Sequence, residues 1–460
     1  MVINRYEESH IKNMALPSEW RSQAALDELD AFLQANWEQR AIFYDDGQIN
    51  SRQQFLGFTG QKGIKTQNYI GTIVFKGNQV NIFPKVFRED KEDNDTDSLS
   101  LKHMIFNLVK WLDYCSKIDY PFVNITGALE DCDDLRELFI TLYLRFVKSA
   151  IEHGMYYCYE EVTEETTAVK GRVDYRDYFT KKYANGKLDK LDCSFSTFEF
   201  DNALNRIIKY TCKGLLTDTV SVSNQRLIRQ ILMRLTDVSD IHCTPHDCDK
   251  IRLSRLHKHY SIVLSMSKMF LLNKTSAYNI DDTESFCFLF PTELLFEGFV
   301  GGFMQSVLEG QAKVRLQASE ESVFSDVIYG DQSLGKAMRM KHDILVEHKS
   351  KGLFILDTKY KMINRFDGSD DIKDIVSNEA KSQDIYQVLT YARTRGLQDV
   401  YLLYPMFRYE ENEPKNPYGI NLTPAGDNPI RVHLVRLPFV FEKNEERTKQ
   451  CLAKAIQNLF

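Results

Sequence analysis

The alternation of apolar and polar positions predicts an α/β unit in the last part of the chain. An apolar helix opens at Pro291-Thr292, and strand and turn patterns then dominate as far as Lys361. A second helix covers the stretch AKSQDIYQVLTYARTRG and is followed by a strand in DVYLLYPM. This order of helix, three strands, helix and strand is typical of a mixed sheet with helices packed on it.

Upstream, the same patterns predict a mixture of strands and helices. The run YIGTIVFKGNQVNIFPKV, over 69–86, predicts a hairpin because two β-branched runs flank Gly77-Asn78. Shorter strands are expected at 156–162 and 170–173. Apolar positions at helical spacing predict helices over 22–37, 101–114, 135–153, 201–216, 224–235 and 253–272. Asp201 is the expected N-cap of the fourth of these helices.

Composition indicates where these elements divide. The stretch 88–97 reads REDKEDNDTD, an acidic run without core-forming residues, which predicts a flexible loop or a boundary. A chain of 460 residues is expected to form two or three domains. We therefore predict an N-terminal β-containing region over 1–98, a mainly helical middle domain over 99–285 and an α/β domain over 286–460.

The overall composition is that of a soluble globular protein, with 43% hydrophobic and 27% charged residues. No apolar run is long enough for a membrane span, and the stretch MVINRYEESHIKNM lacks the apolar segment of a secretory signal. Nine cysteines without framework spacing suit reduced thiols, so we expect a cytoplasmic protein without a membrane partner. The net charge of −7 excludes a wholly basic surface, and nucleic-acid binding would need local patches.

One cluster has the residue types of a zinc site: His242, Cys243, His246 and Cys248. It contains no CxxC pair and no second half-site, both of which structural zinc sites usually show. The sequence therefore favours a loop between helices over a metal site at this position.

The stretch KHDILVEHKSKGLFILDTKYKMI, over 341–363, predicts two antiparallel strands joined by a tight turn. Opposed residues in such a hairpin have a constant sum of residue numbers, so a turn centred on Ser350 places Asp343 across from Asp357. Cross-strand neighbours on one face lie roughly 5 Å apart. Strand alternation places Lys359 on the same face as Asp357. The apolar run before Asp357 predicts a strand covered on both faces, with these charges at its end.

Two converging carboxylates at a buried strand end suit a divalent metal, with Mg²⁺ expected and Mn²⁺ as the alternative. Such a metal lowers the pKa of a bound water and offsets charge that builds on a phosphodiester. Lys359 would orient that water or stabilise the attacked phosphate. Without a cation the carboxylates of Asp343 and Asp357 repel each other, which raises the pKa of one of them. The competing interpretation is a hairpin edge on which Asp357 and Lys359 form a solvent-exposed ion pair.

Three further features flank this hairpin. Glu297 lies in the apolar helix LLFEGFVGGFM and either points at the site or reaches solvent at the helix edge. Gln387 and Tyr391 are four residues apart and share one helix face, where they either hold the DNA strand or pack on the sheet. A local excess of positive charge suits a polyanion or a solvated surface: Lys336, Arg339, Lys341, Lys349, Lys351 and Lys361.

Together these motifs resemble the PD-(D/E)xK nuclease fold: the helix with Glu297, the pair His342-Asp343, the run DTKYK at 357–361, and D-x-Y-Q-x-x-x-Y at 384–391. More narrowly, the chain resembles the McrC family, the nuclease subunit of McrBC-type modification-dependent restriction systems. The segments YIGTIVFKGNQVNIFPK, VKGRVDYRDYF and FSTFEFDNALNRIIKYTCKGLL resemble further parts of that family, over about residues 60–405. His342 stands where the family usually has proline.

The resemblance implies an α/β PD-(D/E)xK nuclease domain, a mixed sheet flanked by helices, after a mixed α+β N-terminal region. It also implies roles for six side chains. Metal ligation is implied for Glu297, Asp343 and Asp357, and catalysis for these three with Lys359. DNA binding is implied for Gln387 and Tyr391, and the local positive charge predicts it for Lys341 and Lys361.

In function, the resemblance implies a Mg²⁺-dependent endonuclease that cuts double-stranded DNA within a GTP-dependent complex. Region 1–98 would dock on a hexameric, McrB-like AAA+ GTPase and stimulate it, and the partner would recognise the modified base. The sequence has no G-x-x-x-x-G-K-[ST] loop, so we expect this chain to bind no nucleotide and the partner to use GTP. One such site cuts one strand, and dimerisation of nuclease domains would allow both strands to be cut; the sequence leaves this open.

Two other functions remain open from the sequence. The chain would be a non-catalytic adaptor that activates the GTPase and retains a nuclease-like fold, or a stand-alone DNA repair nuclease that needs no partner. The presence of every catalytic residue type favours the endonuclease over the adaptor. The adjacent gene would separate the partner-dependent functions from the repair nuclease.

Overall fold

The computed structural model describes most of the chain. The described residues are 1–35, 54–58, 63–88, 101–115, 135–186, 190–278, 285–319, 322–329, 332–333, 335–361, 363, 382–406, 419–422, 430–442 and 445–460. Their contacts form two compact units. Unit 1 holds the described residues of Met1–Gln34, Phe43–Leu135 and Phe286–Phe460, and unit 2 holds those of Ala35–Ile42 and Arg136–Ser285. The predicted boundary loop at 88–97 lies outside the described residues after Arg88.

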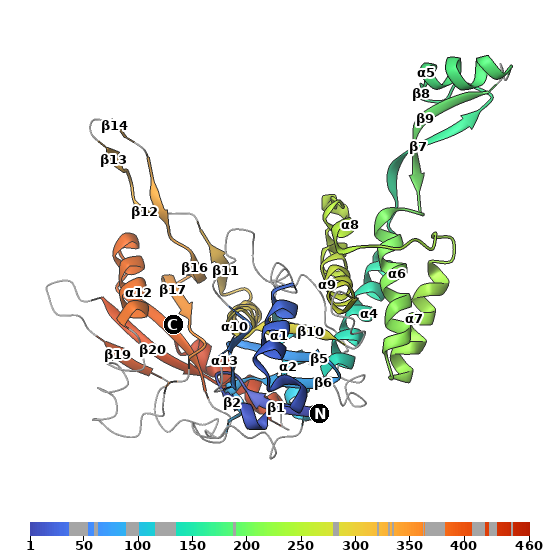
Figure 1. Ribbon diagram of the computed structural model, residues 1–460. Helices are drawn as coiled ribbons and strands as arrows, with labels where there is room; N and C mark the ends of the chain where they lie inside the picture. Colours follow the sequence, from blue (N-terminus) through green and yellow to red (C-terminus); the bar gives the residue numbers. More distant parts are fainter. Residues whose placement is uncertain are drawn as a thin grey trace. The chain divides into compact units, whose positions relative to one another are not determined.

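The larger sheet of unit 1 is a six-stranded mixed sheet (Figure 1). Its spatial order is β11 (Ala312–Ala318), β16 (His342–His348), β17 (Gly352–Thr358), β18 (Asp399–Pro405), β20 (Arg431–Leu437) and β19 (Gly419–Leu422). The first three strands are antiparallel, β17, β18 and β20 are parallel, and β19 returns antiparallel. The prediction of a mixed α/β sheet is therefore confirmed.

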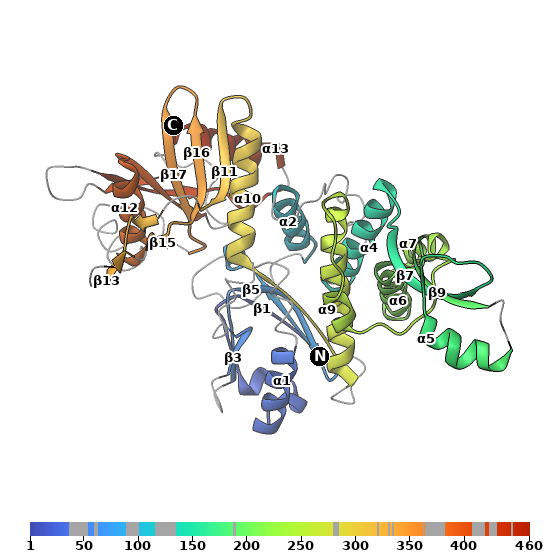
Figure 2. The ribbon, with the colours of Figure 1, turned by 90° about the horizontal axis from the view of Figure 1, so that it is seen from above.

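Helices cover this sheet as the apolar patterns require. They are α10 (Thr292–Val307), α12 (Ser382–Arg395) and α13 (Glu445–Gln457). Figure 2 shows α10 running beside β11 and β16, with which it is in contact. On α12, Val388 and Ala392 are fully buried and join Ile355 and Val400 of the sheet in one apolar core. This packing holds α12 beside β17 and β18, the strands that position the candidate site.

A second, four-stranded sheet occupies the N-terminal part of unit 1. Its order is β1 (Val2–Tyr6), β6 (Asn78–Phe83), β5 (Tyr69–Phe75) and β10 (Phe286–Pro291). The predicted β5–β6 hairpin is confirmed, with Phe75 paired to Asn78 and the turn at Lys76 and Gly77. Both turn residues have positive φ, 49° and 68°, as a two-residue turn between twisted strands requires. Beside this sheet are β2 (His10–Lys12), β3 (Leu56–Phe58), β4 (Gly63–Thr66) and α1 (Gln23–Ala35).

Helix α2 (Leu101–Tyr114) belongs to unit 1, although the sequence placed it in the middle domain. Trp111 stacks on Phe439 with ring centroids 4.0 Å apart and donates its indole N–H to the Phe439 carbonyl. Close contact with α10 depends on Gly302, because a Cβ there would lie 1.7 Å from the Tyr114 carbonyl oxygen. These contacts join segments more than 180 residues apart, which periodicity along the chain does not reveal.

Unit 2 combines a helical bundle with an extended β arm (Figure 1). The bundle contains α4 (Leu135–His153), α6 (Ala203–Asp218), α7 (Val222–Arg234), α8 (Pro245–Asp249) and α9 (Ser261–Tyr278). The arm contains β7 (Cys158–Thr166), β8 (Arg172–Val173) and β9 (Leu191–Glu199), with the short helix α5 (Tyr175–Asp177). None of the helices in the described part of the chain combines the length and apolar character needed to cross a bilayer.

The N-cap prediction for α6 is wrong by one residue. Asn202, not Asp201, caps the helix, and its side chain accepts a hydrogen bond from the Asn205 N–H. Asp201 instead pairs with Arg206 at 2.7 Å and accepts the Ser239 N–H. Both residues are good N-caps, so only the tertiary partner of Asp201 decides between them.

Candidate functional site

The hairpin of β16 and β17 has the predicted register. Ile344 pairs with Leu356 and Val346 with Phe354, so the residue numbers of each pair add to 700 as expected. The apolar residues of both strands, including Leu345 and Ile355, are fully buried. Asp343 and Asp357 continue this register by one step beyond the Ile344–Leu356 pair.

Asp343 is held by the end of the neighbouring strand. Its Oδ2 accepts hydrogen bonds from both the backbone N–H and the hydroxyl of Thr358, each at 2.8 Å. A β-branched threonine with few rotamers gives this carboxylate a fixed orientation. The second oxygen of the Asp343 carboxylate takes part in neither of these bonds.

Asp357 is buried beside a single ammonium group. Its Oδ2 lies 2.5 Å from the Lys359 Nζ. Burial and, to a lesser extent, the charge of Asp343 raise the pKa of Asp357 to about 7, although Lys359 opposes both. Burial alone would lower the pKa of Lys359, but Asp357, Asp343 and Asp384 outweigh it and raise that pKa. The competing prediction of a solvent-exposed ion pair is therefore wrong, because Asp357 is only 1% exposed.

Helix α12 brings the two late-helix residues to this strand end. The Gln387 Nε2 donates to the Tyr391 hydroxyl at 2.8 Å, and its Oε1 lies 3.4 Å from the Lys359 Nζ. The Tyr391 hydroxyl donates to the Lys341 backbone carbonyl at 3.2 Å. Both side chains therefore share one face of α12, as their spacing predicted, and they belong to the same polar network as Lys359.

Lys361 and Asp384 form a second ion pair next to the first. Asp384 is buried, and its charge reaches both Asp357 and Lys359. Sequence reasoning assigned no role to Asp384. Its position three residues before Gln387 and seven before Tyr391 places it on the same helix face, which could have identified it.

Glu297 lies on the buried face of α10 and accepts a hydrogen bond from the Gln317 side chain of β11. Gln317 lies next to Ala318, which pairs with His342 at the start of β16. The prediction that Glu297 reaches solvent at the helix edge is therefore wrong, since its side chain turns inward. Its predicted role as a metal ligand stays a prediction.

His342 is fully buried at the start of β16. Its ring meets the Tyr391 ring edge to face, with centroids 4.6 Å apart. Burial, helped by the charge of Arg395, lowers the pKa of His342 to about 4, so the imidazole is neutral near pH 7. The ring therefore packs under the site and supports Tyr391.

The residue types at this strand end fit a divalent cation. Asp343 and Asp357 supply hard oxygen donors, and their mutual repulsion is a penalty that a cation would remove. Among the described residues, however, no group of three or more His, Cys, Asp or Glu side chains is arranged to hold a metal ion. The carboxylates that the structure brings together at this strand end are those of Asp343 and Asp357.

The cysteine and histidine cluster of unit 2 has a packing role. Cys243 and Cys248 join Ile207 and Leu271 in an apolar cluster. Burial raises the pKa values of the two thiols to about 11 and about 12, which disfavours the thiolate form that zinc needs. The His242 ring packs on Tyr210 at 5.1 Å.

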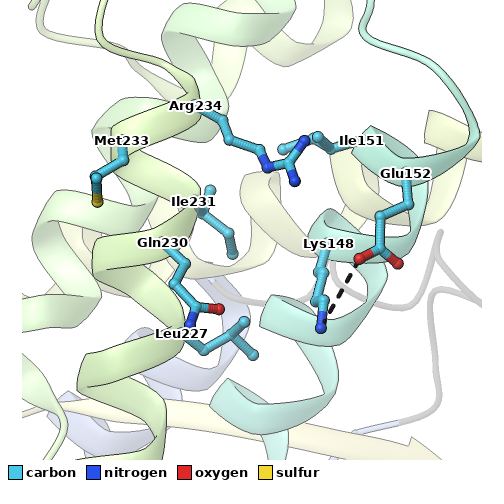
Figure 3. A pocket seen from close by; sticks show the side chains of 8 residues that line it. All are labelled: Lys148, Ile151, Glu152, Leu227, Gln230, Ile231, Met233 and Arg234. Carbon is cyan, nitrogen blue, oxygen red and sulfur yellow. Dashed lines mark ion pairs between the residues drawn. The ribbon is translucent and has the colours of Figure 1, made fainter.

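A cavity of about 270 Å³ lies between α4 and α7 in unit 2 (Figure 3). Ile151, Leu227 and Ile231 line it, and Lys148 and Glu152 form an ion pair at 3.8 Å on one side. Its ionisable groups lie along exposed helix surface, and no buried carboxylate or nucleophile enters it. The strand end with Asp357 is the stronger candidate for chemistry.

Comparison with known proteins gives a consistent result. The family model described as McrBC 5-methylcytosine restriction system component matches residues 64–405. One solved structure similar to this chain is the half-complex from a tetradecameric assembly of Thermococcus gammatolerans McrB AAA+ hexamers with bound McrC. Its TM-score is 0.60 at 16% identity, with 100% of both chains covered, which shows a shared fold. The Thermococcus gammatolerans McrBC complex gives 0.46 at 17% identity, over 70% of this chain and 90% of that one. No curated protein matches.

Proposed function

The chain belongs to the family of McrBC 5-methylcytosine restriction system components, and we propose that it is the DNA-cleaving subunit of such a system. The supporting observation is the meeting of Asp343, Asp357 and Lys359 where β16 starts and β17 ends. Two carboxylates and one amine in this order are the residue types of a PD-(D/E)xK nuclease. The proposed reaction is hydrolysis of phosphodiester bonds in double-stranded DNA.

In the proposed mechanism, Asp343 and Asp357 would hold Mg²⁺, with Mn²⁺ as a substitute. When bound, the ion would offset the charge that builds on the attacked phosphate and make a nearby water more acidic. Lys359 keeps its proton beside these carboxylates and would donate hydrogen bonds to the phosphate or hold the water. Gln387 would steady the Lys359 amine, and Tyr391 would steady Gln387.

Glu297, Lys341 and Lys361 complete the proposal. Glu297 would contribute a further carboxylate if its bond to Gln317 rearranges. The Lys341 side chain is half-buried beside the site, and the Lys361 ammonium faces Asp384. Both lysines would contact DNA phosphates, which attract ammonium groups without regard to sequence.

We also propose that this chain works with an AAA+ GTPase, because the similar Thermococcus gammatolerans assembly consists of McrB AAA+ hexamers with bound McrC. The partner would use GTP, and this chain would stimulate it. Region 1–98 was the predicted docking surface, but much of its described part is buried in the core of unit 1. Docking through that region remains one alternative.

The arm of unit 2, residues 157–199, offers a more suitable docking surface. Large aromatic side chains are exposed along it: Tyr157, Tyr159, Tyr175, Phe179, Tyr183 and Phe198. Tyr159 is 74% and Phe198 59% exposed, and Phe198 stacks on Tyr157 with centroids 5.2 Å apart. Exposed aromatic clusters of this kind mark protein interfaces. We propose that this arm contacts the GTPase.

Cleavage is tested with the full-length chain, an McrB-like GTPase, GTP, Mg²⁺ and 5-methylcytosine-containing plasmid. Asp357→Ala and Lys359→Ala should each lower the cleavage rate on the order of a hundredfold or more. Glu347→Gln, at the other end of the same hairpin, is the matched control and should cleave normally. Unchanged cleavage by the Asp357 and Lys359 variants would rule out the proposed chemistry.

Docking is tested by measuring how strongly the chain stimulates GTP hydrolysis by the partner. Tyr159→Ser combined with Phe198→Ser should raise the concentration needed for half-maximal stimulation by about tenfold or more. Met14→Ser is the control in region 1–98, since Met14 is 89% exposed there. If only the Met14 variant weakens stimulation, docking belongs to region 1–98 and the proposed arm contact is wrong.

One observation favours a second function, that of a non-catalytic adaptor. The described residues hold no group of three potential metal ligands, whereas a working nuclease gathers several. An adaptor would stimulate the GTPase fully while Asp357→Ala left every activity of the complex unchanged. The cleavage experiment above therefore separates the two functions.

A further inference from the structure

A second buried carboxylate, that of Glu7, lies outside the motifs that the sequence analysis assigned to the site. Glu7 directly follows β1 and is fully buried. Its neighbour Glu8 has a positive φ of 57°, and the side chain of Glu8 is exposed while that of Glu7 turns inward. A charged group is rarely buried without fixed partners, so the partners of Glu7 indicate its purpose.

Glu7 accepts hydrogen bonds from three donors on three separate segments. The Tyr360 hydroxyl donates at 3.0 Å and the Lys85 backbone N–H at 3.1 Å to its Oε2. The Thr292 hydroxyl donates to its Oε1. Lys85, Tyr360 and Thr292 are themselves buried. One carboxylate therefore joins the N-terminal sheet, the start of α10 and the chain that leaves β17.

The segment after β17 explains why this junction matters. Tyr360 directly follows Lys359 just beyond the end of β17, where the Lys361 N–H donates to the Lys359 carbonyl at 2.8 Å and turns the chain. The Lys359 Nζ meets Asp357, whereas the Tyr360 hydroxyl meets Glu7. The Lys359 backbone is fixed separately, because its N–H donates to the Leu403 carbonyl at 2.8 Å. The backbone bond of Lys359 and the side-chain bond of Tyr360 therefore hold this segment at two successive residues, and together they orient the Lys359 side chain.

The Thr292 bond fixes a second part of the site. Thr292 is the first residue of α10, and its N–H donates to the Asn68 carbonyl at 3.2 Å. Glu297 lies five residues later on the same helix, roughly 7.5 Å along its axis. Anchoring Thr292 to Glu7 therefore sets where Glu297 stands relative to Lys359.

Several charged groups surround Glu7 and hold the junction together. The Lys85 ammonium pairs with Glu8 at 2.9 Å and lies 4.9 Å from the centre of the Tyr360 ring. Arg88 donates to the Glu7 backbone carbonyl and to the Ser9 hydroxyl. The opposite charge of Lys85 compensates the buried carboxylate in part, which a junction under a charged site requires.

We propose that Glu7 is a positioning residue for the candidate nuclease site. Its carboxylate ties Tyr360 and Thr292 to the N-terminal sheet and thereby fixes the direction of the Lys359 side chain. The N-terminal sheet is then part of the machinery that shapes the site. The expected effect on cleavage rests on the proposed function. The expected effect on the position of the Lys359 side chain does not.

The first test measures the exposure of Lys359 without any enzyme assay. The full-length chain is treated briefly with an amine-acetylating reagent, and mass spectrometry compares acetylation of Lys359 with that of the exposed Lys454. In the wild type, burial and Asp357 protect Lys359. Glu7→Gln and Tyr360→Phe should each raise its acetylation severalfold. Glu28→Gln, a change to an exposed carboxylate of α1 that pairs with Lys76 and not with the Glu7 junction, is the matched control and should leave it unchanged.

The second test is cleavage by the complex with its AAA+ GTPase. Glu7→Gln and Tyr360→Phe should each lower kcat by about tenfold, since small misplacements of a reacting group are costly, while KM for DNA stays the same. The double variant should be no slower than Glu7→Gln alone, because the Tyr360 hydroxyl acts through the same hydrogen bond to Glu7 that both changes disrupt. A merely structural role would lower the melting temperature and leave kcat unchanged.

Unchanged acetylation of Lys359 in both variants overturns the inference. If the wild-type complex cuts no DNA, the proposed function fails, and acetylation alone still decides the positioning role. Should Glu7→Gln fail to fold, Tyr360→Phe removes a single hydroxyl and carries the test.

Discussion

Two buried carboxylates of unit 1, those of Glu7 and Asp357, have similarly raised pKa values but different surroundings. Burial raises the pKa of Glu7 to about 7 and that of Asp357 to about 7. For Glu7, Lys85 and the hydrogen bonds of Thr292 and Tyr360 all act to lower the pKa. For Asp357, the like charge of Asp343 adds to the effect of burial. Burial alone therefore does not distinguish a structural carboxylate from a functional one.

The difference lies in the balance of charge and donors. Three fixed donors complete the Glu7 carboxylate. At the hairpin end, the carboxyl groups of Asp343, Asp357 and Asp384 outnumber the ammonium groups of Lys359 and Lys361, so one negative charge is uncompensated whenever Asp357 is ionised. An excess of negative charge favours the binding of a cation at the hairpin end. The Glu7 carboxylate already has its hydrogen-bond donors and has no need of a cation.

The largest expected effect tests the Glu7 side of this comparison. Its folded-state pKa of about 7 lies above the ordinary value of 4.5, so the folded protein binds more protons between these two pH values. Stability should therefore fall as pH rises through this window, by about 3 kcal/mol in total for this one group. Glu7→Gln should remove that loss.

The measurement is urea denaturation of the wild type and of Glu7→Gln at pH 5 and pH 8. The carboxyls of Asp113 and Asp357 also titrate in this range, so the difference between the two proteins isolates Glu7. Identical pH dependence of stability in both proteins would show that folding does not raise the pKa of Glu7.

The next effect tests the Asp357 side. A divalent cation that binds the folded site should stabilise the protein by about 2.7 kcal/mol at a hundredfold excess over its Kd. Thermal unfolding with Mg²⁺ and with EDTA measures this difference. Asp343→Asn and Asp357→Asn should each abolish it, while Glu7→Gln should keep it. An equal Mg²⁺ effect in both aspartate variants would place the ion elsewhere.

A smaller effect concerns Lys361, which the sequence assigned to DNA and the structure pairs with Asp384. Lys361→Met should destabilise the protein by about 1 kcal/mol, because the pair is partly buried. If Lys361 also contacts phosphate, the dependence of log K for DNA on log salt concentration should weaken by about one unit. Fluorescence anisotropy at several salt concentrations measures this slope. An unchanged slope would restrict Lys361 to the ion pair.

The hairpin site could be predicted from the sequence because the residues that define its turn and strands lie close together along the chain. A turn at Ser350 and two apolar runs fix which residues face each other, and the structure confirms the pairing up to Ile344 and Leu356. Gln387 and Tyr391 also met as predicted, since residues four apart share a helix face. The roles of these residues stay predictions, because geometry alone does not measure cleavage.

The Glu7 junction could not be predicted in this way. Glu7 and Tyr360 are 353 residues apart, and nothing in the pattern around Glu7 marks it as buried. The same holds for α2, whose Trp111 packs on Phe439 from the far end of the chain. Contacts of this kind depend on the three-dimensional arrangement of whole sheets, which periodicity does not determine.

The smallest expected effect separates support from chemistry within the site itself. Tyr391→Phe keeps the ring that packs on His342 and removes only the hydroxyl that bonds Gln387 and the Lys341 carbonyl. Stability should fall by about 0.5–1 kcal/mol, the usual contribution of a hydrogen bond. Urea denaturation measures this change. Cleavage should fall only a few fold, because Gln387 would still reach Lys359.

Tyr386→Phe is the matched control for this variant. Tyr386 lies on the same helix and is 67% exposed, so loss of its hydroxyl should change neither stability nor cleavage. A loss of cleavage by Tyr391→Phe as large as that of Lys359→Ala would make the Tyr391 hydroxyl a reacting group. In that case the site at the hairpin end would use a proton donor as well as a cation, whereas the Glu7 carboxylate would still have only a structural role.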